Sequence, residues 1–447
     1  MNKIRQPAPG SSTQSLANRY RSGGNNRTNN VRNIPKPTDP NRKVIKHGAP
    51  DFQLLVLTFI LVGFGILMVF SASSSLTFTS ERFHYDSMYF TKRHIIFALI
   101  GFVAMFFAMK AHYSKYKKWF APFFLVTLLM LLAVLVIGSK INGARSWIAL
   151  PAGASIQPAE FAKLAVILYL SALIAKKGER LRDLRTGYIP VMLIVGLVAG
   201  LIMLQPDLGS CMILVATAGL IIYTGGASVK HIFASVALLV LGAALVFGVN
   251  SLFSHDSSDK GDSNYRMGRI ETFLNPFADE RGAGYNMIQS LTAIGQGGFT
   301  GSGFGQSIQK LHYLPNPYND FIFSVIGEEF GFVGTALFLL AYIYFIVRGI
   351  WIALKCPDIF GTLAGVGIMG MFAIQAFINI GGVTNTIPLT GVPLPFISYG
   401  GTSLIITMLS MGIMLSISRE TNRALAEQQA TGSEYGTRRQ SISMRMK

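Results

Sequence analysis

Ten apolar stretches recur along almost the whole chain, and they constrain its fold more than any other feature. Each is close to the about 20 residues that a helix needs to cross a hydrocarbon core of roughly 30 Å. The composition agrees, since 51% of the 447 residues are hydrophobic and only 13% are charged, unlike an ordinary soluble domain. We therefore predict an all-α polytopic membrane protein with about ten transmembrane helices. The predicted spans are 52–72, 94–109, 119–138, 158–175, 188–204, 210–226, 231–250, 321–347, 359–382 and 402–418.

Basic residues set the expected orientation of these spans. Lys and Arg concentrate in the first 50 residues, in the loops at 110–118 and 176–185, and after residue 418. Loops on the cytoplasmic side of a membrane carry an excess of these residues. We therefore expect a multi-pass protein of the cell membrane with both termini in the cytoplasm. The net charge of +18 then reflects topology, and no nucleic-acid recognition fold is visible.

This topology divides the chain into three regions. Residues 1–50 are polar and basic, which predicts a disordered cytoplasmic tail. Residues 51–419 form the transmembrane domain, and residues 420–447 form a second cytoplasmic tail. A large extracellular loop at 251–320 separates the seventh and eighth helices. Polar, Gly and Pro residues gather in the outer loops, so we look for the functional site on the outer face.

Several common active-site patterns are absent. The glycine-rich stretch GQGGFTGSGFG lacks the Gly-Lys-Ser/Thr of a phosphate-binding loop, so a turn or re-entrant segment is favoured over a nucleotide site. There is no HExxH, and the two cysteines lie in or beside predicted spans, which argues against a zinc site. No metal site is predicted. Carboxylates, amides and a few basic residues remain as candidates.

Ionisable residues within spans are costly, at about 2.5–3.5 kcal/mol each at a helix centre, so they mark candidate sites. Glu160 and Lys163 share one helix face and can neutralise each other, either as a structural pair or within a catalytic site. Asp207, at a helix junction, is placed to cap the next helix. Arg145 and Trp147 offer either an interfacial anchor or a cationic, stacking surface for a sugar-phosphate lipid.

Asp320 stands at the mouth of the apolar run that follows LPNPYND. If the helix includes Asp320, the residues that share its face are small. This face predicts either close helix packing or a groove for a lipid chain. Glu328 and Glu329 lie deeper in the run and suit structural hydrogen bonding, so Asp320 is the better candidate base. The small residues on its face are Ser324, Gly327 and Gly331.

Five motifs in order resemble the SEDS family of shape, elongation, division and sporulation proteins. They are GARSWIALP, QPAEFAK, QPDLGS, KLHYLPNPYNDFIFSVIGEE and TGVPLPFISYGGTS. The resemblance covers about residues 50–419. The opening PDFQLLVLTFILVGFGILMVFSASS is most similar to the FtsW division branch and its SpoVE sporulation relative, with the RodA rod-shape branch as the alternative. It implies a peptidoglycan glycosyltransferase that polymerises lipid II at the outer face of the membrane in septal wall synthesis.

The same resemblance implies roles for individual residues. The family's essential loop aspartate corresponds to Asp320, a general base for the acceptor GlcNAc 4-hydroxyl. Cations should stabilise the departing undecaprenyl diphosphate, and a divalent cation (Mg or Mn) is compatible with this, although no ligand cluster requires one. The expected substrate-binding residues are Arg145 first, then Lys163, Arg266, Arg269 and Lys310, with Trp147 and Glu160 from family motifs. The expected structural motif residues are Asp207, Glu328, Glu329, Pro395, Ser398 and Gly400.

The chain departs from the family beside its candidate base. Many relatives read LPEAHTDFIF or LPEPxTDFIF, whereas this chain has Asn316 for the Glu, Tyr318 near the usual His, and Asn319 for the Thr. Asp320 is unchanged. Any role for the neighbouring acid or imidazole therefore does not transfer to this chain.

Two other functions fit the same sequence. Many spans with membrane-embedded charges are typical of transporters, so a lipid II flippase is an alternative. The second alternative is a membrane scaffold for a class B penicillin-binding transpeptidase, which is expected to dock through the spans 321–347 and 359–382; other divisome membrane proteins are also expected partners. The stretch GTLAGVGIMG in the span 359–382 is rich in small residues, which favours helix association there.

Overall fold

The structure is a computed structural model. It describes residues 48–141, 144–149, 155–239, 241, 272–280, 282 and 284–445, with side chains described up to residue 429 apart from those of Lys140, Ile141 and Ala144. Residues 1–47 of the predicted N-terminal tail and residues 251–271 of the predicted large loop, including Arg266 and Arg269, lie outside the described residues.

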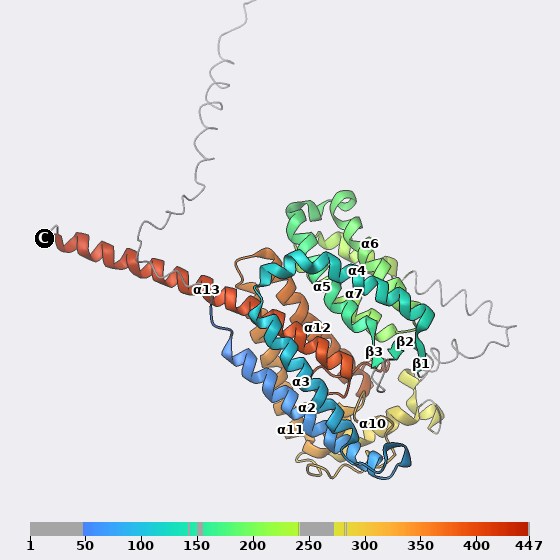
Figure 1. Cartoon of the computed structure of the whole chain (residues 1–447). Coiled ribbons are helices and arrows are strands. Elements are labelled where there is room, and N and C mark those ends of the chain that lie inside the picture. Colours follow the sequence, from blue (N-terminus) through green and yellow to red (C-terminus); the bar gives the residue numbers. More distant parts are fainter. Residues whose placement is uncertain are drawn as a thin grey trace, which may run out of the picture. The chain divides into compact units, whose positions relative to one another are not determined.

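The described part of the chain is dominated by long apolar helices (Figure 1). Eight of them are long and apolar enough to cross a membrane, and two shorter apolar helices, Leu208–Thr224 and Val229–Leu239, lie where the sequence predicts the sixth and seventh spans. A polytopic α-helical membrane protein is thus confirmed, and the count of ten spans stays a prediction. The helices are α2 (Phe52–Phe78), α3 (Tyr89–Lys110), α4 (Tyr113–Ile137), α5 (Pro158–Lys177), α6 (Ile189–Met203), α7 (Leu208–Thr224), α10 (Tyr285–Gln296), α11 (Ile322–Leu354), α12 (Ile359–Val383) and α13 (Gly401–Arg445).

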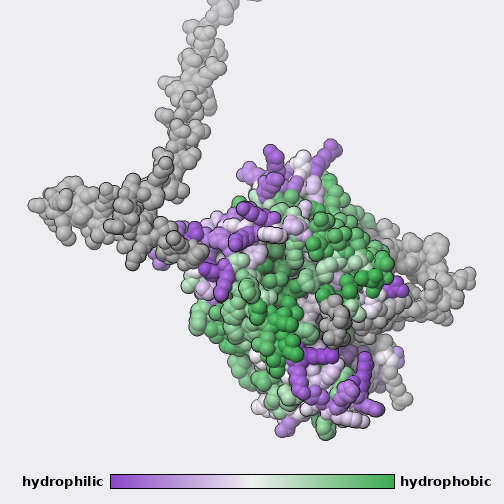
Figure 2. Space-filling view, in the orientation of Figure 1, coloured by the Kyte–Doolittle hydropathy of each residue, from purple (hydrophilic) through white to green (hydrophobic). Residues whose placement is uncertain are grey.

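Burial separates inner from outer helices. In the spans formed by α5, α12 and α13, 78% of the most apolar 18-residue window is buried, against 17% for α4 and α11. Within the bundle α3 lies along α13, α11 along α12, and α4 along α5 (Figure 1). Figure 2 shows hydrophobic residues gathered in the middle of the visible face and hydrophilic ones toward its ends. The outer helices therefore present the apolar band that a bilayer would cover.

The small residues of α12 pack within the chain. A Cβ on Gly370 would lie 2.2 Å from Leu220 of α7, and one on Gly365 would lie 2.6 Å from Ala353 of α11. The Ala353 methyl group cannot move aside, so Gly365 has no room for a side chain, and Leu220 would have to shift for one at Gly370. The stretch GTLAGVGIMG therefore holds this chain's own helices together and presents no open face to a partner helix.

A small antiparallel sheet, absent from our sequence prediction, follows α4. Its strands are β1 (Ser139–Ile141), β2 (Ala144–Ala149) and β3 (Ser155–Ile156), in the order β1-β2-β3. Ser139 pairs with Trp147, and Ile148 pairs with Ile156. The sheet carries the predicted residues Arg145 and Trp147.

A kink at Gly331 divides α11. The backbone of Gly331 has φ 60° and ψ −164°, which is not helical. Phe332 N–H donates to the Gly298 carbonyl at 2.8 Å, and Ser302 N–H donates to the Glu328 carbonyl at 2.9 Å. The glycine-rich loop thus replaces the helical bonds that the kink breaks. Its glycines allow the close approach of backbone to backbone.

The kink yields a stability prediction for Gly331→Ala. The φ value is unfavourable for a residue with a Cβ, and that atom would lie 2.2 Å from the Gly301 nitrogen. Strained backbone of this kind costs about 1–3 kcal/mol, before the clash is counted. We expect a clearly lower unfolding temperature in detergent. Gly196→Ala on the exposed side of α6, where a Cβ meets nothing within 4 Å, is the control, and equal unfolding temperatures for the two variants would contradict this account.

Candidate functional site

Asp320 lies in a turn just before α11, which begins at Ile322, and its side chain is half-buried. The side-chain amide of Asn379 on α12 donates to the Asp320 carbonyl at 2.8 Å and to the Val392 carbonyl at 2.7 Å. Asn379 is 3% exposed. One buried amide therefore holds the Asp320 turn and the loop after α12 together.

The small residues predicted to share a face with Asp320 serve helix packing. Asp320 precedes the helix, so its side chain does not lie on the helix face that the sequence predicted for it. Ser324 is fully buried and its hydroxyl lies 2.7 Å from that of Ser290 on α10. A Cβ on Gly327 would stand 3.3 Å from Ile294. Helix α10 therefore covers this face. Of the two alternatives, close helix packing and a lipid groove, the structure favours packing.

The loop between α12 and α13 also lies against Asp320. Gly391 has φ +74°, and a Cβ added there would lie 3.4 Å from Asp320 Oδ2. Tyr399 N–H donates to the Tyr318 carbonyl at 2.9 Å. Two segments separated by 71 to 81 residues in sequence thus meet at the carboxylate. The glycine supplies both the left-handed backbone and the space beside the acid.

The unusual residues before Asp320 have a structural explanation. Asn316 has φ 48°, a left-handed conformation in which Asn is enriched and most residues are not. The ring of Tyr318 stacks on Phe90 of α3 at a centroid distance of 4.2 Å, and Tyr399 meets Phe90 edge-on at 4.9 Å. The departure from the family motif therefore builds an aromatic cluster beside the acid.

Two arginines outside our predicted site adjoin this cluster. Burial raises the pKa of the Tyr318 phenol to about 12, with Tyr399 adding to the shift and Arg82 opposing it. Burial also raises the pKa of Tyr399, and Arg93 opposes part of that shift by hydrogen bonding and charge. Both phenols are therefore protonated at neutral pH and can donate hydrogen bonds, but they cannot act as bases. The sequence offered a clue in the Lys-Arg-His run at the start of the second span.

The sheet that carries Arg145 and Trp147 adjoins the start of α13. Arg145 is exposed and Trp147 is half-buried. The Thr402 hydroxyl, in the first turn of α13, donates to the Ser155 carbonyl of β3 at 2.9 Å. Arg145 therefore lies exposed on a sheet that is held near the candidate site. Its substrate-binding role stays a prediction.

Glu160 and Lys163 form a buried ion pair at 2.8 Å. Lys163 Nζ also donates to Gln375 Oε1 at 3.2 Å, and Gln375 Nε2 donates to the Pro393 carbonyl at 3.0 Å. The pair thereby connects α5 through α12 to the loop beside Asp320. The sequence left open a structural pair or a part of a catalytic site. The neutralised charge and the internal partners of the pair favour the structural role.

Glu328 and Glu329 both bind the loop that precedes the Asp320 turn. Glu328 accepts from the Ser307 hydroxyl at 2.5 Å and from Ile308 N–H at 2.6 Å. Glu329 accepts from Lys310 Nζ at 2.7 Å and from a hydroxyl of α2. Lys310 is 4% exposed. The structure thus commits Lys310 to an internal ion pair rather than to a surface that a diphosphate reaches.

The remaining motif residues shape the backbone. Asp207 caps α7 by accepting from Ser210 N–H at 2.9 Å. Ser398 Oγ accepts from Leu394 N–H at 2.7 Å, which closes a tight turn that contains the buried Pro395. Gly400 provides the carbonyl that receives the first helical bond of α13, from Leu404 N–H at 3.0 Å.

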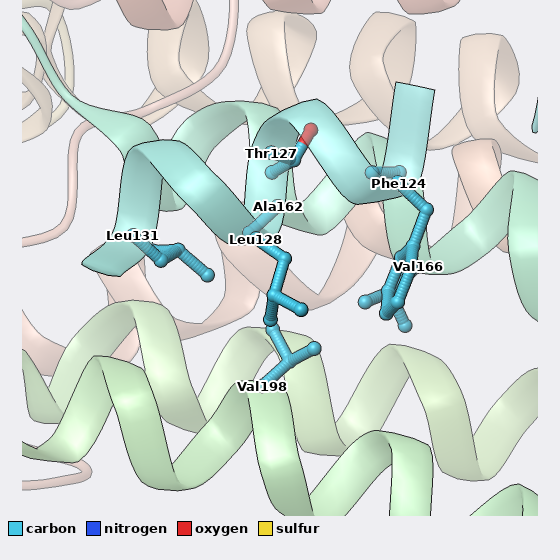
Figure 3. A pocket seen from close by; sticks show the side chains of 8 residues that line it. Phe124, Thr127, Leu128, Leu131, Ala162, Val166 and Val198 are labelled. Atoms are coloured by element: carbon cyan, nitrogen blue, oxygen red, sulfur yellow. The ribbon is translucent and has the colours of Figure 1, made fainter. Parts of the chain in front are cut away.

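The described residues bring no three His, Cys, Asp or Glu side chains together in a way that could hold a metal ion. A divalent cation therefore has no ligand set formed by the described residues alone. A narrow apolar crevice with almost no room for a water-sized molecule lies between α4, α5 and α6 (Figure 3). Its lining is apolar apart from Thr127, so it provides no catalytic group. Its lining residues are Phe124, Thr127, Leu128, Leu131, Ala162, Ala165, Val166 and Val198.

Comparison with known proteins agrees with this architecture. Residues 52–423 match the family model FTSW_RODA_SPOVE, described as cell cycle protein. The stage V sporulation protein E of Bacillus subtilis is 41% identical, covering 84% of this chain and 98% of its own. A protein of the same organism called probable peptidoglycan glycosyltransferase FtsW is 42% identical, covering 82% and 90%.

Solved structures show the same fold. A chain from a study of structural coordination of polymerization and crosslinking by a peptidoglycan synthase complex aligns with a TM-score of 0.66 at 26% identity, over 83% of this chain and 98% of that one. The rod shape determining protein RodA of Thermus thermophilus aligns with a TM-score of 0.59 at 27% identity, over 83% and 97%. The chain therefore belongs to the FtsW, RodA and SpoVE family of cell cycle proteins.

Proposed function

We propose that this protein is a peptidoglycan glycosyltransferase that polymerises lipid II at the outer face of the cell membrane, in septal wall synthesis. The names of its relatives support the reaction class. The observation that carries the proposal is the position of Asp320, a half-buried carboxylate whose backbone is held by Asn379 and whose side chain faces Gly391. The other carboxylates predicted from the sequence hold the bundle together, since Glu160, Glu328 and Glu329 are buried in internal bonds and Asp207 caps α7.

In this proposal Asp320 acts as a general base. Its carboxylate accepts the proton of the acceptor 4-hydroxyl as that oxygen attacks the anomeric carbon of the donor sugar. The bond from that carbon to the diphosphate breaks, and undecaprenyl diphosphate leaves with the bonding electrons. The half-buried rings of Tyr318 and Tyr399, packed on the buried Phe90, offer an aromatic surface on which a sugar ring can lie. Positive charge at Arg93 and Arg82 complements the anionic leaving group.

Replacing the proposed base tests the reaction. Asp320→Asn keeps the size of the side chain and removes the proton acceptor, so glycan synthesis from labelled lipid II should fall at least 100-fold, the lower end of what a general base contributes (about 10²–10⁴). The measurement is a gel of products from the purified protein with its transpeptidase partner. Asp86→Asn, at a half-buried acid paired with Lys92, is the matched control and should retain activity.

The Asp320→Asn variant also distinguishes a polymerase from a lipid II flippase. A flippase would translocate the lipid II headgroup in liposomes equally well with or without the Asp320 carboxylate. Polymerisation by Asp320→Asn within tenfold of the unmodified protein would reject the assigned base. Translocation that persists in the absence of any glycan from the unmodified protein would favour the flippase.

We further propose that a class B penicillin-binding transpeptidase docks along α11. One structural neighbour comes from a peptidoglycan synthase complex that coordinates polymerization and crosslinking, which supports a crosslinking partner for this chain. The small residues of α12 are buried inside this chain, whereas α11 exposes a long row of large apolar side chains. The most exposed members of this row are Phe332, Leu337, Leu340, Ile343, Val347 and Leu354. Other divisome membrane proteins remain expected partners.

Bulky substitutions on α11 test the docking face. Leu340→Trp and Val347→Trp, at positions 63% and 58% exposed, should abolish co-purification of the transpeptidase and leave the unfolding temperature unchanged. Leu129→Trp on α4, at 57% exposure, is the control and should not affect binding. If the α11 variants retain the partner, the docking face lies elsewhere.

A further inference from the structure

Two buried polar side chains on α3 lack hydrogen-bond partners. His94 is fully buried, and neither of its ring nitrogens has a partner among the described residues. Thr91, nearly one turn earlier on the same face, is 3% exposed, and its hydroxyl is likewise unpartnered within the described part of the chain. Buried polar atoms are seldom left in this state, because the lost bond to water is not replaced. Here two such groups lie together on one helix face, so both are available to bond a ligand.

This face of α3 points at the beginning of α13. The His94 ring lies 6.0 Å from the Tyr399 ring, centroid to centroid. Nearly one turn further along α3, the Phe97 ring lies 2.8 Å from where a Cβ on Gly401 would stand. The helices run alongside each other within the bundle. Thr91 and His94 therefore lie beside the residues that open α13.

The first turn of α13 provides backbone hydrogen-bond donors beside Thr91 and His94. The first helical bond of α13 runs from Leu404 N–H to the Gly400 carbonyl, so the N–H groups of Gly401, Thr402 and Ser403 precede it and have no partner within the helix. A helix of this length carries a partial positive charge at its beginning. Gly401 and Ser403 are only half-buried, so a ligand can reach the turn.

We propose that this turn, with Thr91, His94 and Arg93 of α3, binds a diphosphate group. Backbone N–H groups at a helix N-terminus, an imidazole N–H and a guanidinium are all donors that suit phosphoryl oxygens. Arg93 supplies the charge, since its guanidinium lies over the Tyr89 ring at 4.5 Å from the centroid, and that ring contacts Phe90 of the aromatic cluster.

The subsite has a definite place relative to the proposed base. Tyr399 joins the start of α13 to the Asp320 turn through its N–H bond to the Tyr318 carbonyl. A diphosphate bound here would therefore leave the attached sugar beside Asp320. The inference rests on the proposed function, because it assigns the diphosphate to the lipid-linked donor or to the released undecaprenyl diphosphate.

Binding by the full-length protein in nanodiscs tests the subsite. The probes are undecaprenyl diphosphate, undecaprenol and inorganic pyrophosphate, followed by native mass spectrometry and by thermal unfolding. We expect His94→Leu to weaken undecaprenyl diphosphate binding at least fivefold without lowering the unfolding temperature, because it removes an unpaired polar group. His94→Gln, which restores a donor, should recover part of the affinity. Arg93→Gln should weaken binding as well.

A matched control separates local from general effects. Thr217 on α7 is also buried with an unpartnered hydroxyl among the described residues, so Thr217→Val should leave diphosphate binding unchanged. Undecaprenol should bind equally to all variants, since it lacks the anion. Competition by inorganic pyrophosphate supports recognition of the free diphosphate, and its absence shows that the lipid tail is also required.

The outcomes distinguish this inference from the proposed function. Unchanged diphosphate binding in His94→Leu, or a marked fall in its unfolding temperature, would overturn the subsite, and glycan synthesis by the unmodified protein would then still stand. Binding that depends on His94 in a protein that makes no glycan would retain the subsite and reject the polymerase.

Discussion

The buried amides of α12 hold the candidate site together. Gln375 and Asn379 lie four residues apart, so their side chains leave the same face of the helix. Gln375 donates to the Pro393 carbonyl, while Asn379 donates to the carbonyls of Val392 and Asp320. Within an apolar bundle such bonds are strong, and the cost of leaving their carbonyls unmet is high. The geometry of Asp320 therefore depends on two side chains that need not touch substrate.

Two charged elements support this arrangement from opposite sides. The Glu160–Lys163 pair fixes Gln375 from α5, and the two adjacent glutamates of α11 bind the loop before the Asp320 turn. Each charge is costly in the membrane, and each described here has bonded partners. The charged residues of the bundle are thus explained mainly by the need to position irregular backbone at membrane depth.

The sequence predicts the helices well because hydropathy depends on composition over long windows. All ten apolar stretches contain helices, and the motif that carries Asp320 lies at the start of α11. Contacts between distant segments are harder to predict, since hydropathy does not reveal which partner a small residue packs against. The glycines of α12, the kink at Gly331 and the filling of the Ser324 face by α10 all required the structure. The contribution of Arg93 and His94 was missed because both lie at the start of an otherwise ordinary span.

The central claim is that Asn379 orients Asp320 for proton transfer. The most direct measurement is the rate of glycan synthesis by Asn379→Leu, in a preparation whose folding is verified by its unfolding temperature and whose binding of undecaprenyl diphosphate is measured in parallel. Our account predicts that binding is retained and that polymerisation falls at least tenfold, because the carboxylate is present but its backbone is no longer held. A folded Asn379→Leu protein that polymerises at the rate of the unmodified protein would contradict it.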